Sequence, residues 1–180
     1  MARSCGARVQ LRPYDFQEVV PRTGGIPLRT RPQPRQDYHA LELDRWARHL
    51  GMPLVLKPRH YPPADQRPAG RMVMAAQARG LDAQALSHAI LTALWVEQRD
   101  IADPAVRAAI GDALGMDGAA LVAAEGSDAV AVEWAANNAA AIARGVFGSP
   151  TFLYGDLWLW GQDRLFFLEK ALAGEAVQTP

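Results

Sequence analysis

The chain has 180 residues, and its hydrophobic fraction of 49% and charged fraction of 21% are typical of one globular domain or of one domain with a large insertion. Nineteen basic and nineteen acidic residues give zero formal net charge, so no overall field favours binding to nucleic acid or to an anionic membrane. The single cysteine, Cys5, excludes a disulfide framework and a cysteine-built zinc site within these residues. No apolar stretch is long enough to span a membrane and no secretion signal is visible, so we expect a soluble, cytoplasmic protein.

The N-terminal third predicts a strand, a loop and a helix. Residues 8–13 alternate apolar and polar side chains, which indicates a short strand that ends at Pro13. Residues 14–34 are rich in proline and glycine and predict an ordered loop. Apolar residues at helical spacing predict a helix over 35–50, and the five prolines of residues 52–68 predict an extended connection.

The middle of the chain predicts helices, and its end predicts a hairpin followed by one more helix. Capping residues mark three helix starts, at Asp82, at Asp103 before Pro104, and at Ser127. Residues 151–160 predict a β-hairpin with a Gly-Asp turn, and the last helix follows from residue 165 with Leu165, Leu168, Ala171 and Leu172 facing inward. Strands at both ends of the chain and helices between them predict an α/β domain with a helical insertion.

Two C-terminal segments carry the strongest indication of a binding site. Pro150 follows a small residue and precedes a strand, so Ser149–Pro150 is a candidate cis peptide bond that would expose the Ser149 backbone to a peptide-like ligand; a plain loop proline fits the pattern equally well. Asp163 stands at a helix start, where its carboxylate either caps the helix or holds a ligand ammonium group. Together the two features describe a site for a small zwitterionic peptide.

Two other groups of residues carry weaker indications. The arginines at positions 22, 29, 31 and 35 form either a solvated basic loop or a surface that faces a small anionic ligand. The four histidines lie far apart in the sequence and show no spacing typical of metal ligands, so we expect no metal site.

The same C-terminal segments carry a family resemblance. Gly-Val-Phe-Gly-Ser-Pro-Thr-Phe (145–152) and Trp-Gly-Gln-Asp-Arg-Leu (160–165) closely resemble the C-terminal half of the 2-hydroxychromene-2-carboxylate isomerases, which are related to kappa-class glutathione transferases. Matches at Trp95-Val96-Glu97, Asp100–Pro104 and Thr23–Leu28 extend the resemblance over roughly residues 6–175. The resemblance implies an α/β, thioredoxin-like (DsbA-type) domain, residues 1–30 and 145–176, with a large all-helical insertion, residues 31–144. It also implies that the first strand and most of the first helix are missing from the N-terminus.

The implied function is a glutathione-dependent isomerase of the 2-hydroxychromene-2-carboxylate type, in the breakdown of aromatic hydrocarbons. The implied glutathione contacts are Ser149 and Pro150 for the backbone, Gln162 and Asp163 for the γ-glutamyl end, Arg35 facing the site, and Asp65 where the family has an asparagine. The family's reactive serine falls in the segment expected to be missing, so no catalytic residue is assigned. Without that serine, the 180-residue chain could be inactive. The resemblance also implies a homodimer. The alternatives are a kappa-type glutathione transferase, a DsbA-like thiol–disulfide oxidoreductase with cysteines outside these residues, and a non-catalytic glutathione-binding remnant.

Overall fold

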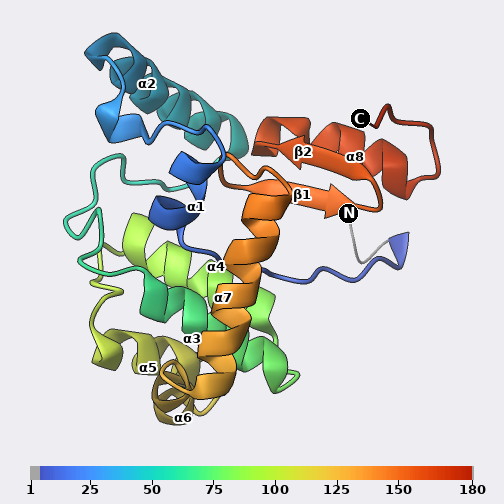
Figure 1. Cartoon of the computed structure of the whole chain (residues 1–180). Coiled ribbons are helices and arrows are strands. Elements are labelled where there is room, and N and C mark those ends of the chain that lie inside the picture. Colours follow the sequence, from blue (N-terminus) through green and yellow to red (C-terminus); the bar gives the residue numbers. More distant parts are fainter. Residues whose placement is uncertain (1–4, 180) are drawn as a thin grey trace.

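Eight α-helices and a two-stranded sheet make up residues 5–179, the part of the chain that the computed structural model describes (Figure 1). The helices are α1 (Phe16–Arg22), α2 (Gln33–Leu50), α3 (Arg67–Ala78), α4 (Ala83–Trp95), α5 (Pro104–Ala113), α6 (Gly118–Ala124), α7 (Asp128–Ala143) and α8 (Leu165–Leu172). The strands are β1 (Thr151–Tyr154) and β2 (Leu157–Trp160), and two short 3-10 turns, η2 (Leu28–Thr30) and η3 (Gln162–Arg164), complete the order. No helix among these residues is long and apolar enough to cross a membrane.

The segment before α1 is not the predicted strand. Residues 7–15 form neither helix nor strand, so the strand expected over residues 8–13 is wrong. Helix side chains pair with this backbone in place of a neighbouring strand: Leu11 N–H donates to Gln77 Oε1 (2.9 Å), Gln77 Nε2 donates to the Leu11 carbonyl (3.1 Å), and Asn137 Nδ2 donates to the Pro13 carbonyl (3.1 Å). The alternating pattern is present, but amide side chains pair with the backbone groups of Leu11 and Pro13 that a sheet ladder would otherwise pair.

The loop expected over residues 14–34 contains helix α1 and the turn η2, so that prediction is also wrong. The Asp15 side chain caps α1 by accepting from the backbone N–H groups of Gln17 (2.9 Å) and Glu18 (3.2 Å). Val19 and Val20 are buried, and Val19 packs in a small cluster with residues of α7 and the loop that follows it. The helix has only seven residues and includes Pro21, so its periodicity is too short to stand out in the sequence.

Helices α3 to α7 enclose the main core. Met72 of α3, Leu86 of α4 and Leu121 of α6 are completely buried and belong to one cluster. The predicted caps are confirmed: Asp82, Asp103 and Ser127 each accept a backbone N–H in the first turn of α4, α5 and α7. A buried ion pair joins α5 to the end of α6, because the Arg107 guanidinium contacts both oxygens of Glu125 at 2.7 Å.

Helix α2 confirms the prediction over residues 35–50 and begins two residues earlier. It ends at Gly51, which adopts a φ of 64°. Ala47 is its one buried residue, and Figure 1 shows α2 projecting from the rest of the molecule.

The C-terminal hairpin and α8 are also confirmed. β1 and β2 pair antiparallel, with Thr151 opposite Trp160 and Tyr154 opposite Leu157. Helix α8 has no buried residue; its predicted inward positions are partly covered, and Phe166 is 51% exposed. Figure 1 places the hairpin and α8 at one end of the molecule and α5 and α6 at the other. The expected division into two domains stays a prediction.

Candidate functional site

The loop between α7 and β1 carries the predicted cis peptide bond, Ser149–Pro150. Both residues are exposed. Within residues 5–179, neither the N–H nor the C=O of Ser149 takes part in a backbone hydrogen bond. The loop therefore presents a free donor and a free acceptor of one residue at the surface, which an extended peptide can pair with in the manner of a strand.

A backbone hydrogen bond joins this loop to the start of the last helix. Gly161 N–H donates to the Pro150 carbonyl at 3.0 Å, and Thr151 Oγ1 donates to the Gly148 carbonyl at 2.7 Å. Gly161 has a φ of 93°, and a side chain there would meet the Asp163 carboxylate. The structure thus brings Ser149 and Pro150 together with Gln162 and Asp163.

Asp163 lies within the turn η3 and is not the cap of α8. No side-chain capping hydrogen bond is found at the start of η3 or of α8. The Asp163 carboxylate instead pairs with Arg164 Nη1 at 2.6 Å, and the side chains are 41% and 51% exposed. An ion pair this exposed is worth at most about 1 kcal/mol, so the carboxylate is accessible to a competing cation.

An aromatic group that the sequence did not single out lies beside the cis-proline loop. The Phe147 ring centroid lies 5.0 Å from that of Trp158 and 5.2 Å from that of Trp160. Gly148 packs so closely on the Trp160 indole that a Cβ there would lie 2.9 Å from Cε2. Phe147 and Trp160 are each more than one-third exposed, which leaves apolar surface next to the loop.

Tyr14 is a second residue that sequence reasoning missed. Its hydroxyl is buried, faces the Ser149 side chain, and has no hydrogen-bond partner of good geometry in the described chain. Burial raises the pKa of Tyr14 above its ordinary value, and the Ser149 side chain offsets part of that rise. Nothing in the local sequence could have located this contact, because 135 positions separate the two residues.

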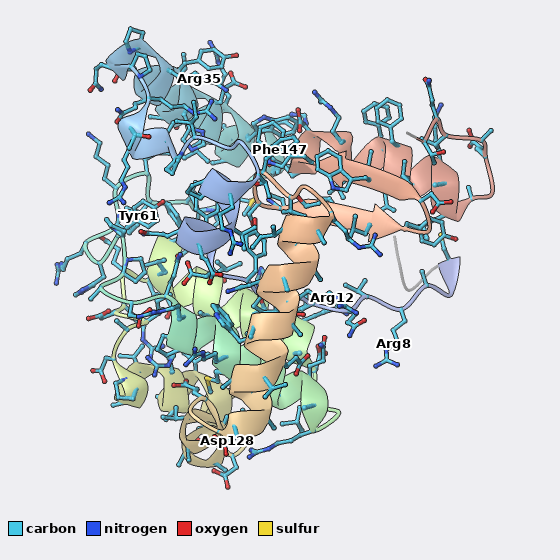
Figure 2. All side chains as sticks on the ribbon, viewed as in Figure 1. Arg8, Arg12, Arg35, Tyr61, Asp128 and Phe147 are labelled. Atoms are coloured by element: carbon cyan, nitrogen blue, oxygen red, sulfur yellow. The ribbon has the colours of Figure 1, made fainter. Side chains whose placement is uncertain are left out.

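The other two predicted site residues lie elsewhere. Arg35 is exposed near the start of α2, with its guanidinium 5.7 Å from the Tyr38 ring centroid, and Figure 2 shows it well away from Phe147. Asp65 pairs through both oxygens with Arg67, which lowers the pKa of that carboxyl. Neither contacts the cis-proline loop within the described residues, and their roles stay predictions. Within residues 5–179, no three or more histidine, cysteine, aspartate or glutamate side chains form a group that could hold a metal ion.

Comparison with known proteins identifies the family of this chain. A family model described as a DSBA-like thioredoxin domain matches residues 1–173. Among curated proteins, the 2-hydroxychromene-2-carboxylate isomerase of Pseudomonas putida is 31% identical over 175 residues, 96% of this chain and 83% of the relative. The enzyme of the same name from Sphingobium xenophagum is 31% identical over 174 residues, 96% of this chain and 86% of the relative. A solved structure of a 2-hydroxychromene-2-carboxylate isomerase superposes with a TM-score of 0.78 at 29% identity, covering 96% of this chain and 83% of that one.

Proposed function

The chain belongs to the family of DsbA-like thioredoxin domains and, within it, to the 2-hydroxychromene-2-carboxylate isomerases, and from that premise we propose that this isomerase acts on 2-hydroxychromene-2-carboxylate or a close analogue and binds glutathione. The similarity to the named isomerases supports the reaction, since it extends over almost the whole chain. We assign the reaction to the breakdown of aromatic hydrocarbons. The geometry of the C-terminal site supports glutathione as the bound peptide.

The observation that carries the proposal is the hydrogen bond from Gly161 N–H to the Pro150 carbonyl. It holds the unpaired backbone of Ser149 next to the exposed carboxylate of Asp163. Glutathione is a short peptide with amide groups along its length and an ammonium and a carboxylate at its γ-glutamyl end. The unpaired N–H and C=O of Ser149 match the amide groups, and the Asp163 carboxylate matches the ammonium.

The Asp163 carboxylate releases Arg164 and binds the γ-glutamyl ammonium in its place. The existing pair is exposed on both sides, so little free energy is lost when it opens. The Gln162 amide, which adjoins it in η3, donates to the γ-glutamyl carboxylate. The substrate's aromatic ring packs against the exposed faces of Phe147 and Trp160 beside the loop.

The first test compares the reaction rate with and without glutathione. The protein is incubated with 2-hydroxychromene-2-carboxylate, and the change in its ultraviolet absorbance is followed at increasing glutathione concentration. We expect a rate that depends on glutathione and saturates. Equal rates in the presence and absence of glutathione would exclude glutathione dependence, and no change under either condition would count against the isomerase assignment.

The second test concerns binding alone and does not require turnover. Asp163→Asn removes the charge at constant size, and we expect the dissociation constant for glutathione, measured by calorimetry, to rise at least about tenfold because a charge-assisted hydrogen bond is lost. Asp156→Asn is the matched control, since Asp156 is an exposed acid in the hairpin turn outside the site. Equal affinities of the two variants would show that Asp163 does not bind the ligand.

A further inference from the structure

A cavity of about 510 Å³ is lined by residues of α1, α3 and α7. Figure 1 shows α1 and α3 beside α7, and both helices contact it. Its polar lining comes from Glu18 and Arg22 of α1, Arg71 of α3 and Asn138 of α7. Its apolar lining comes from Trp134 and a row of alanines along α7, of which Ala135 is central. None of the residues of the cis-proline site lines it, so the cavity is separate from the glutathione site proposed above.

Arg71 is the cation in this cavity that lacks an anion. Its guanidinium carbon lies 5.3 Å from the Trp134 ring centroid, so one face of the group is covered by the indole. Its Nε is buried and has no hydrogen-bond partner. Within residues 5–179, Arg71 forms no ion pair with any carboxylate. Arg71 as a whole is only partly buried, and a guanidinium without an anion at a cavity wall is suited to a ligand that supplies one.

The acids near Arg71 are already engaged by other groups. Glu18 accepts from Asn138 Nδ2 at 2.7 Å and pairs with Arg22 at 3.5 Å. The charge of Arg71 does reach Asp65 and helps to lower the pKa of that carboxyl. Asp65, however, is held through both oxygens by Arg67. One positive charge therefore remains uncompensated at the cavity wall.

Most of the lining that α7 contributes is apolar. Ala131, Ala135 and Ala139 follow each other at intervals of four along α7, so they form one row on the helix surface. Small side chains along this row leave the room that the cavity occupies. A ligand that fits both walls has a single carboxylate at one end and an uncharged, apolar body at the other.

We propose that this cavity is a binding site for small monocarboxylic acids with an apolar body, with Arg71 as the residue that holds the carboxylate. The planar guanidinium, oriented by the Trp134 ring, donates to the carboxylate oxygens, and the apolar body lies along the alanine row. Arg22 stays paired with Glu18, so one anion neutralises the cavity.

Benzoate is a suitable probe, and benzamide is its neutral counterpart. We expect benzoate to bind in calorimetric titration and benzamide to bind at least about tenfold more weakly, because benzamide lacks the charge that Arg71 recognises. Saturating glutathione and Asp163→Asn leave benzoate binding unchanged, since both act at the cis-proline site. Displacement of benzoate by glutathione would instead place the acid in that site and overturn the proposal.

Two pairs of variants localise the ligand. Arg71→Gln weakens benzoate binding at least about tenfold, while Arg79→Gln, which removes an exposed arginine just beyond the end of α3, leaves it unchanged. Ala135→Leu fills the cavity from an exposed position and abolishes binding, whereas Ala136→Leu adds the same group next to it, outside the cavity, and does not. If Arg71→Gln does not fold by circular dichroism, the alanine pair decides alone. Binding that survives Ala135→Leu overturns the proposal.

Discussion

The helical block formed by α3 to α7 and the C-terminal unit formed by the hairpin and α8 differ in how they are packed. The helical block buries whole side chains such as Met72 and Leu86, whereas α8 has no buried residue. The cis-proline site belongs to the thinly covered unit, at the end of the molecule away from α5 and α6 (Figure 1). The block therefore supplies a rigid scaffold, and the residues proposed to bind glutathione lie where local opening costs little.

Two arginine–carboxylate pairs show the same contrast. Arg107 and Glu125 in the helical block are 4% and 10% exposed, and Arg107 also donates to the carbonyls of Ile101 and Ala102 at 2.9 Å. Arg164 and Asp163 in the C-terminal unit are 51% and 41% exposed. The buried pair is fixed by its surroundings, while the exposed pair can exchange one partner for a ligand.

The largest effect is expected from breaking the buried pair. Glu125→Ala leaves the Arg107 guanidinium buried without its anion, and we expect the free energy of unfolding to fall by about 3–5 kcal/mol. Urea unfolding followed by circular dichroism at 222 nm measures this. The matched control is Glu42→Ala, which breaks the exposed Arg45–Glu42 pair on α2 and should cost less than about 1 kcal/mol. Similar losses for both variants would mean that the helical block is not where stability resides.

A pair of glycine substitutions compares the two regions directly. A Cβ at Gly118 would lie 2.7 Å from the carbonyl carbon of Ala108, so Gly118→Ala forces α5 and α6 apart and should cost about 1–3 kcal/mol. A Cβ at Gly148 would meet the Trp160 indole, which is 44% exposed and can shift. Gly148→Ala should therefore cost less than about 1 kcal/mol of stability but weaken glutathione binding, because the shift moves the cis-proline loop. Unfolding and calorimetric titration of both variants separate the two effects, and weaker binding by Gly118→Ala alone would contradict the division.

A smaller effect is expected at the N-terminal segment, residues 7–15, which is hydrogen-bonded to Gln77 of the helical block. Gln77→Ala removes both hydrogen bonds to the Leu11 backbone and should cost about 1–2 kcal/mol. The effect should appear first as faster amide hydrogen exchange at Leu11. The control Gln33→Ala removes an exposed hydrogen bond to Asp37 and should leave that exchange rate unchanged.

The starts of α4, α5 and α7 and the hairpin could be predicted because their signals are local. Asp82, Asp103 and Ser127 act within a few residues of where they stand, and the hairpin strands have the two-residue connection that their turn requires. The prediction of a strand over residues 8–13 was wrong because tertiary contacts decide the structure of this segment. Its alternating pattern suits a strand, but the atoms that pair with it belong to Gln77 and Asn137, and no local rule indicates that.

Some features of the candidate site could likewise be predicted from local sequence, and others depend on tertiary structure. The cis peptide bond and the position of Asp163 follow from short motifs, which together predict one peptide-binding site. The hydrogen bond that joins them, from Gly161 to Pro150, was not foreseen, although both ends lie in those motifs. Tyr14 could not be found at all, since its link to Ser149 depends on how α7 returns the chain to the N-terminal segment.

The smallest expected effect concerns Tyr14, which lies where the two regions meet. Burial raises its folded-state pKa above the value near 10 that tyrosine has in the unfolded chain. As pH rises past about 10, the unfolded state therefore loses its proton first, and the folded protein becomes less stable until Tyr14 itself ionises. Tyr14→Phe removes this dependence, so the wild-type protein should lose stability relative to the variant above about pH 10, while below that pH the difference stays constant. Urea midpoints measured between pH 8 and pH 11 test this, with Tyr61→Phe as the control because Tyr61 is 55% exposed. A constant difference across the whole range would show that the Tyr14 hydroxyl is hydrated, and that the junction between the scaffold and the cis-proline loop is open to water.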